Sequence, residues 1–131
     1  MAYVLIIDDD EDFSNAAAIE LREAGYEVAE ELSIAGGQAS IAAREPDILL
    51  LDVMFPEDSS AGLKLAQTLH KDVPTLPIIL LTAVNQEFPL GFSKKDIDDV
   101  HMPVNDFLEK PVDLDTLCRT VSELIKKTKS P

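Results

Sequence analysis

The sequence predicts an α/β fold in which one doubly wound parallel sheet is covered by helices on both faces. Short apolar runs recur along the chain, and each is followed by residues whose apolar positions have helical spacing. This alternation of strand and helix is typical of parallel sheets. A length of 131 residues fits one domain, and no repeat or linker divides it. We therefore expect a single domain over residues 1–131, with no effector domain.

Five short segments are predicted as strands. Three are almost continuously apolar, YVLII, DILLL and PIILL, which suits strands buried on both faces of a sheet. The second predicted strand is more polar and suits a sheet edge. In chain order the predicted strands are residues 3–7, the segment around Tyr26 and Val28, residues 47–51, residues 77–81 and residues 104–108.

A helix is predicted after each of these strands, but after the fourth it is only a short one that follows a loop. Gly25 supplies a stop for the first helix, Ser33 a cap for the second and Asp113 a cap for the last. Pro89 and Gly91 disfavour a continuous helix after the fourth strand, so we expect a loop there. In chain order the predicted helices are residues 11–24, 34–44, 63–71, a short helix within 93–100 after a loop over 84–92, and a final helix after Asp113.

The composition excludes several classes of function. Asp and Glu number 25 against 11 Lys and Arg, giving a net charge of −14, so nucleic acid and anionic membranes are poor partners. One cysteine excludes an internal disulfide and a Cys-rich zinc site, and two distant histidines form no ligand pattern. The chain starts with no signal peptide and contains no apolar run of about 18 residues. We expect a cytoplasmic protein.

Polar residues follow the predicted strands where each strand ends. Asp8 and Asp9 follow the first strand, Asp52 the third and Thr82 the fourth, while Lys110 comes two residues after the fifth. In a doubly wound sheet the carboxyl ends of the strands form the ligand-binding edge. Crowded carboxylates repel each other unless a cation lies between them, and oxygen ligands of this kind suit magnesium.

Four motifs in this order resemble the receiver domain of two-component response regulators, over essentially the whole chain. The resemblance implies a flavodoxin-like receiver fold, with a five-stranded sheet in the order 2-1-3-4-5 and five helices. The motifs are IIDDDED after the first strand, DILLLDVMFP around Asp52, PIILLTA ending at Thr82 and Ala83, and FLEKP at 107–111.

The resemblance also implies a role for each residue of the acidic cluster. Asp52 corresponds to the phosphoacceptor, which takes a phosphoryl group from a sensor histidine kinase or a histidine phosphotransfer protein. Asp9 corresponds to the direct Mg²⁺ ligand, and Asp8 acts mainly through water. The main-chain carbonyl of Met54 completes the ligand set.

The remaining roles fall on the last two strands. Thr82 and Lys110 are expected to bind the phosphoryl oxygens, and Phe107 has the position of the aromatic switch that moves with Thr82. The Lys110–Pro111 bond is expected to be cis. Such a domain is no enzyme in the ordinary sense: it catalyses at most its own phosphotransfer and dephosphorylation, and it signals through an output partner or by self-dimerisation.

Two alternatives remain open from the sequence. Asp8 and Asp10 match the DxD motif of haloacid dehalogenase-type phosphatases, although Asp12 stands where that family expects Thr or Val. A degenerate receiver could act as a binding module alone. The chain also departs from the receiver pattern, because EDSSA intervenes between Pro56 and Gly62 and because residues 84–103 interrupt the usual helix. Asp10 and its two acidic successors are expected to be helix caps rather than ligands.

Overall fold

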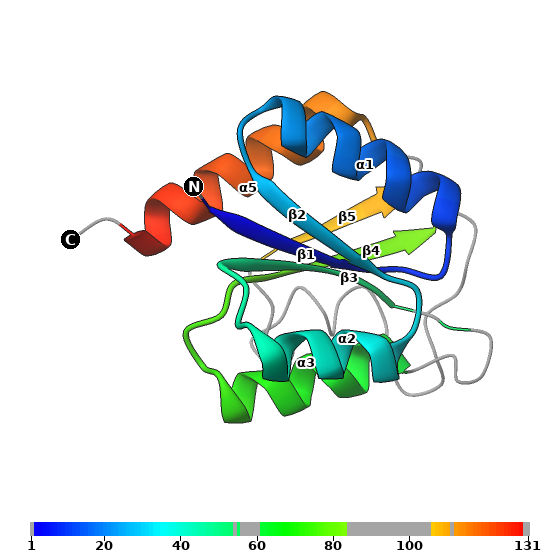
Figure 1. Ribbon diagram of the computed structural model, residues 1–131, viewed down its shortest axis with the longest axis vertical. Helices are drawn as coiled ribbons and strands as arrows, with labels where there is room; N and C mark the ends of the chain where they lie inside the picture. The colour runs from blue at the N-terminus through cyan, green and yellow to red at the C-terminus, as the bar shows by residue number, and fades with distance from the viewer. Residues whose placement is uncertain (1, 54, 56–60, 84–105, 111, 130–131) are drawn as a thin grey trace.

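The computed structural model describes residues 2–53, 55, 61–83, 106–110 and 112–129 (Figure 1). All strands in these ranges belong to one parallel sheet, whose order β2-β1-β3-β4-β5 confirms the predicted topology. The strands are β1 Tyr3–Ile7, β2 Glu27–Glu31, β3 Ile48–Asp52, β4 Ile78–Ala83 and β5 Asp106–Lys110. The helices are α1 Glu11–Glu23, α2 Ile34–Ala43, α3 Ala61–Asp72 and α5 Leu114–Lys129.

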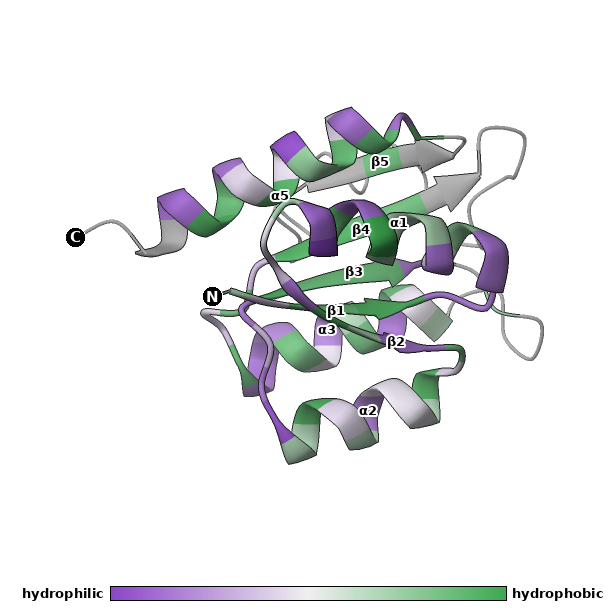
Figure 2. Ribbon diagram, turned by 45° about the horizontal axis from the view of Figure 1, so that its top comes forward, coloured by the Kyte–Doolittle hydropathy of each residue, from purple (hydrophilic) through white to green (hydrophobic). Residues whose placement is uncertain are grey.

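The helices form a layer on each face of the sheet. α1 and α5 contact each other on one face, while α2 and α3 contact each other on the opposite face (Figure 1). The central strands β1 and β3 are buried along their whole length, and their side chains alternate between two apolar clusters. Leu5 and Ile7 pack toward α3, whereas Val4 and Ile6 pack toward α1 and α5. Figure 2 shows these strands as a continuous apolar layer.

The structure confirms the predicted helix caps at Ser33 and Asp113 and the predicted stop at Gly25. The Ser33 hydroxyl accepts a hydrogen bond from the Gly36 N–H (3.0 Å), and an Asp113 oxygen accepts one from the Thr116 N–H (3.2 Å). Each bond satisfies one of the N–H groups that the first helical turn leaves without a partner. Beyond α1, Gly25 has a φ of 101°, a conformation that side chains with a Cβ rarely adopt.

β5 covers Asp106–Lys110 and so ends two residues later than the predicted strand over residues 104–108, whose first two residues lie outside the described ranges. β5 lies at the edge of the sheet beside β4, where a strand tolerates charged residues such as those at its end. Its register places Phe107 opposite Leu80 and Lys110 opposite Ala83. Lys110 is therefore the last residue of the strand, not a residue beyond it.

Several predictions concern residues outside the described ranges. They are the loop over 84–92, the helix within 93–100 and the geometry of the Lys110–Pro111 bond. Among the residues that the structure does describe, no helix is both long and apolar enough to span a bilayer.

Candidate functional site

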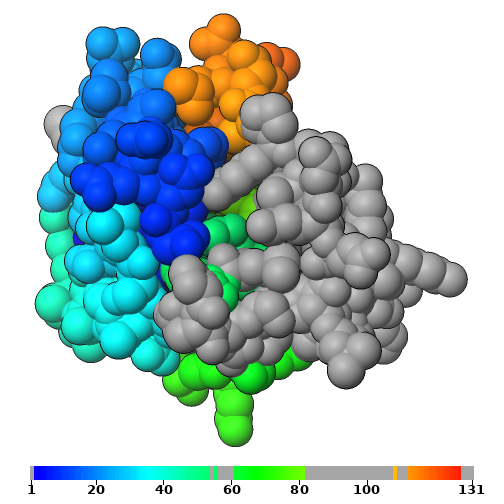
Figure 3. Space-filling model, turned by 90° about the vertical axis from the view of Figure 1, so that its right-hand side faces the viewer, coloured from blue at the N-terminus to red at the C-terminus, as the bar shows by residue number. Residues whose placement is uncertain are grey.

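Three aspartates meet at the carboxyl edge of the sheet, as the sequence predicts. One carboxylate oxygen each from Asp8, Asp9 and Asp52 lies within 4.8 Å of the other two. Asp8 follows β1 and is fully buried, Asp52 ends β3 and is 7% exposed, and Asp9 is exposed. Figure 3 looks onto this edge, where the segment that follows β1 (dark blue) lies next to the region of α2 (cyan).

Neighbouring segments fix the position of Asp8. Its backbone N–H donates to the carbonyl of Glu31, the last residue of β2 (3.0 Å). Its Oδ1 accepts a hydrogen bond from the backbone N–H of Asp10 (2.9 Å). Asp8 is thus held through both its backbone and its carboxylate, which orients a charged group that has no access to solvent.

Asp10 itself caps α1 and stands apart from the acidic cluster. Its Oδ1 accepts a hydrogen bond from the Phe13 N–H (3.1 Å), which confirms the capping role expected for it. Among the described residues, the set whose carboxylate oxygens meet contains Asp9 and not Asp10. The second aspartate of the DxD motif thus caps a helix and is not a member of this carboxylate cluster.

The backbone that follows Asp52 is hydrogen-bonded to both β4 and the start of α3. The Val53 N–H donates to the carbonyl of Leu81 (3.0 Å), and the Val53 carbonyl accepts from the Gly62 N–H (3.0 Å). At Gly62 a Cβ would lie only 1.9 Å from the carbonyl oxygen of Asp52. A glycine is required here because the start of α3 approaches the end of β3 so closely. Gly62, which the EDSSA insertion separates from Pro56, is therefore the glycine that allows this close approach.

The backbones of Thr82 and Lys110 reach the same edge. Leu81 lies opposite Asp52 in the β3–β4 register, so Thr82 is the next residue outward. In the β4–β5 register, Thr82 pairs with Glu109 and Ala83 with Lys110. The side chains of Thr82, Phe107 and Lys110, and the whole of Met54, lie outside what the structure describes.

The donor set fits a hard divalent cation. Carboxylate oxygens are the ligands that Mg²⁺ prefers, and it usually binds through one or two carboxylates while keeping several waters. Asp8 and Asp52 are buried, so their mutual repulsion is poorly screened and a cation between them offsets it. Asp9 is exposed and open to a hydrated ion.

Two serine–glutamate bridges beside the site were missed by the sequence analysis. The buried Ser14 of α1 donates to Glu30 Oε1 (2.7 Å), and Ser40 of α2 donates to Glu31 Oε2 (2.5 Å). They bind the end of β2 from both faces of the sheet. Ser14 interrupts the apolar face of α1, so periodicity carried no signal for its burial.

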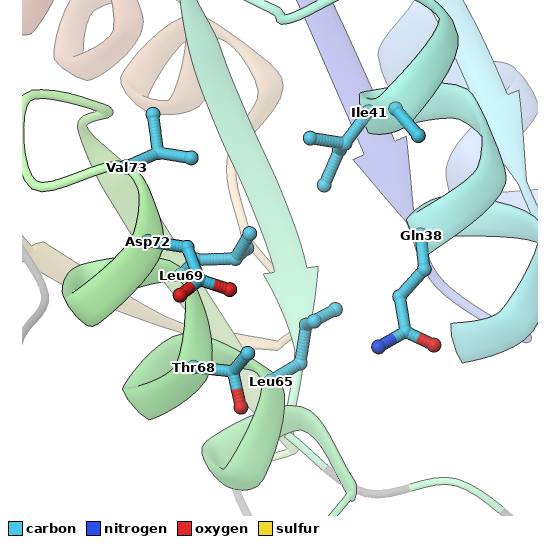
Figure 4. Close-up of a pocket in the computed structure, with 8 residues that line it drawn as sticks. Gln38, Ile41, Leu65, Thr68, Leu69, Asp72 and Val73 are labelled. Atoms are coloured by element: carbon cyan, nitrogen blue, oxygen red, sulfur yellow. The ribbon is translucent and has the colours of Figure 1, made fainter.

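A groove between α2 and α3 is a separate feature. It has a volume of about 210 Å³, and none of the predicted site residues lines it. Figure 4 shows Ile41 of α2 facing Leu65, Leu69 and Val73 across it, with Asp72 at the rim. The groove is lined mainly by apolar side chains, together with Gln38, Thr68 and Asp72, and lies apart from the acidic cluster.

Outside the acidic cluster, charge pairing and burial shift pKa values among the described groups, including those of Glu27 and Cys118. At the opposite end of the strands, Arg44 pairs with Glu27, and this hydrogen bond lowers the pKa of the Glu27 carboxyl. The Arg44 guanidinium also stacks over Tyr3, 4.1 Å from the ring centre. On α5, burial raises the pKa of the Cys118 thiol, and Cys118 packs against the apolar cluster under α1.

The sequence matches the family described as response regulator receiver domain over residues 4–122. It is 33% identical to the DNA-binding dual master transcriptional regulator RpaA of Synechocystis over 130 residues, covering 98% of this chain and 51% of RpaA. The chain thus spans about half of that relative. It is 28% identical to protein PilH of Pseudomonas aeruginosa, covering 95% of this chain and 98% of PilH.

The fold agrees with these relationships. The structure of the Francisella response regulator 1452 receiver domain superposes with a TM-score of 0.82 at 25% identity, covering 98% of this chain and all of that one. Neither the family match nor the relatives support the haloacid dehalogenase-type alternative. The sheet order, the acidic edge and the match across most of its length agree, and the chain belongs to the receiver domain family of two-component response regulators.

Proposed function

We propose that this receiver domain accepts a phosphoryl group on the carboxylate of Asp52. The observation that carries the proposal is the meeting of Asp8, Asp9 and Asp52 within 4.8 Å at the carboxyl edge of the sheet. In the transfer, an Asp52 oxygen forms a bond to phosphorus while the bond from phosphorus to a donor histidine nitrogen breaks. The domain acts on no separate substrate, so it is a phosphoacceptor and not an enzyme with turnover.

The three aspartates bind Mg²⁺ in different ways. Asp9 is exposed and serves as the direct ligand, while the buried Asp8 acts through a bound water, and Asp52 contributes an oxygen as well. Met54 adds its main-chain carbonyl, as the family resemblance implies. When bound, Mg²⁺ supplies positive charge that offsets the repulsion between the carboxylates and the incoming phosphoryl oxygens.

The ends of β4 and β5 complete the proposed site. Thr82 donates a hydrogen bond to the transferred phosphoryl group, and Lys110 supplies a point charge to the same oxygens. Their backbones at the ends of neighbouring strands support this assignment. Phe107 then changes rotamer as Thr82 moves inward, which shifts the domain between inactive and active populations.

The partners follow from this chemistry. The donor is a sensor histidine kinase or a histidine phosphotransfer protein, and the cytoplasm, where kinases obtain ATP, is the compartment that we propose. The net charge of −14 disfavours DNA as a direct partner of residues 1–131, which we treat as one receiver domain. As output partner of these residues we propose another protein or a second copy of the domain.

Labelling with acetyl phosphate tests the proposal. The wild-type chain with Mg²⁺ is expected to acquire an acid-stable, hydroxylamine-labile phosphoryl group, and EDTA is expected to prevent it. Asp52→Asn keeps the fold and abolishes labelling. Persistent labelling of Asp52→Asn would place the acceptor elsewhere, and a wild-type chain that never labels would indicate a degenerate receiver that only binds partners.

A further inference from the structure

We propose that Asp10 is a positioning residue for the magnesium site. By capping α1, its side chain fixes the peptide whose N–H orients the carboxylate of Asp8. This inference rests on the proposed function, because it concerns how Asp8 is presented to a bound cation. Asp10 itself does not belong to the acidic cluster.

The first step is the bond between Asp10 and Asp8. The Asp10 N–H lies 2.9 Å from Asp8 Oδ1, within normal hydrogen-bond range. A carboxylate is a rigid planar group, so an amide that fixes one oxygen also fixes the direction of the other. Asp8 is fully buried, and no bulk water competes for this bond. The orientation of the Asp8 carboxylate therefore depends on where the Asp10 amide points.

The second step is that α1 fixes the Asp10 amide. Asp10 has the extended backbone of an N-cap, with φ −83° and ψ 95°. Its Oδ1 accepts from the Phe13 N–H (3.1 Å), and its carbonyl accepts from the Ser14 N–H (3.0 Å). These two bonds hold Asp10 against the first turn of the helix. Without the side-chain acceptor that turn frays, and the amide is released with it.

The third step is that hydrogen bonds connect both Ser14 and Asp8 to the end of β2. Ser14 donates to the side chain of Glu30, and the Asp8 N–H donates to the carbonyl of the adjacent Glu31. A closed ring thus runs from Asp8 through Asp10, Ser14 and the end of β2, and back to Asp8. In this ring the backbone carbonyl of Asp10 makes the link to Ser14, and the Asp10 side chain adds a second link to the helix through the Phe13 N–H.

The test compares Asp10→Ala with Asp10→Asn. Both variants remove the same negative charge near the cluster, but only Asn keeps an oxygen that can cap the helix. Ser33→Ala is the matched stability control, because it removes the equivalent cap of α2, where Ser33 accepts from the Gly36 N–H (3.0 Å). Two quantities are measured: the Mg²⁺ dissociation constant by calorimetry, and the hydrogen exchange of the residue-10 amide without metal by NMR.

The dissociation constant of Asp10→Ala is expected to exceed that of Asp10→Asn by up to about fivefold, the ratio that one lost N-cap represents. Its residue-10 amide is expected to exchange faster, while Ser33→Ala retains wild-type values of both. Equal dissociation constants in the two Asp10 variants, or an equal loss in Ser33→Ala, would overturn the proposal. A wild-type chain that binds no Mg²⁺ would instead overturn the proposed magnesium site, and the exchange rates would then decide the claim about geometry.

Discussion

Replacing Gly62 with Ala tests how tightly the start of α3 is bound to the end of β3. A Cβ at this position would lie 1.9 Å from the Asp52 carbonyl oxygen, 2.7 Å from the Val53 carbonyl oxygen and 2.8 Å from Val53 Cα. The closest of these distances is about 1.5 Å inside the 3.4 Å at which ordinary contact begins. All three atoms belong to the backbone, so no side-chain rotation relieves the overlap.

The magnitude follows from two opposing effects. Ala is favoured over Gly in a helix by about 1 kcal/mol, whereas overpacking of this kind costs about 3 kcal/mol or more. We expect Gly62→Ala to lower the free energy of unfolding by about 2 kcal/mol, which corresponds to a fall in Tm of roughly 6–10 °C. The displaced backbone carries Asp52, so labelling by acetyl phosphate should slow as well.

Gly36→Ala provides the control in α2. The two nearest atoms to a Cβ at Gly36 are the ends of side chains and not backbone: Glu31 Oε1 at 2.7 Å and Ser33 Oγ at 3.0 Å, which can shift at little cost. Gly36→Ala is therefore expected to leave the stability unchanged or to raise it by up to about 1 kcal/mol. Thermal unfolding followed by circular dichroism measures both variants, since the chain has no tryptophan. A Gly62→Ala protein as stable as Gly36→Ala would refute the close approach of α3 to Asp52.

Three further predictions concern charge, burial and the metal site. The hydrogen bond from Arg44 lowers the pKa of Glu27 below its unfolded value, so its contribution to stability is present above the ordinary pKa of 4.5 and is lost as the pH falls through the folded value. Glu27→Gln should therefore lower Tm at neutral pH, and this deficit should shrink as the pH is lowered below 4.5; a deficit independent of pH would contradict this. Burial raises the pKa of Cys118, so iodoacetamide should alkylate it more slowly in the folded chain than in urea; equal rates would argue that the thiol is exposed. Asp9→Asn should weaken Mg²⁺ binding about tenfold or more, whereas Asp12→Asn, an exposed charge outside the cluster, should leave it nearly unchanged; equal losses would mean that only net charge matters.

The fold was largely predictable because its central strands are apolar on both sides. The runs in β1, β3 and β4 have no polar residue before their carboxyl ends, so both the strands and the polar edge could be read from the sequence. The strand order was inferred from the family resemblance and not from periodicity. The end of β5 was predicted two residues too early, because an edge strand has no such apolar signature.

The acidic site was predictable for the same reason, whereas its supporting contacts were not. Asp8 and Asp52 directly end apolar runs, so topology alone brings them together. The bridge from Ser14 to Glu30 spans 16 residues and joins a helix to a strand, which no local pattern encodes. The closeness of Gly62 to the Asp52 carbonyl likewise depends on how α3 packs onto the sheet.

The most direct test of the account is to identify the residue that carries the phosphoryl group. The wild-type chain is labelled with acetyl phosphate and Mg²⁺, the acyl phosphate is reduced with borohydride to homoserine, and the modified position is located by peptide mass spectrometry. Homoserine is expected at position 52 alone, and no homoserine is expected when Mg²⁺ is withheld. Modification at Asp8 or Asp9 with position 52 intact would contradict the account.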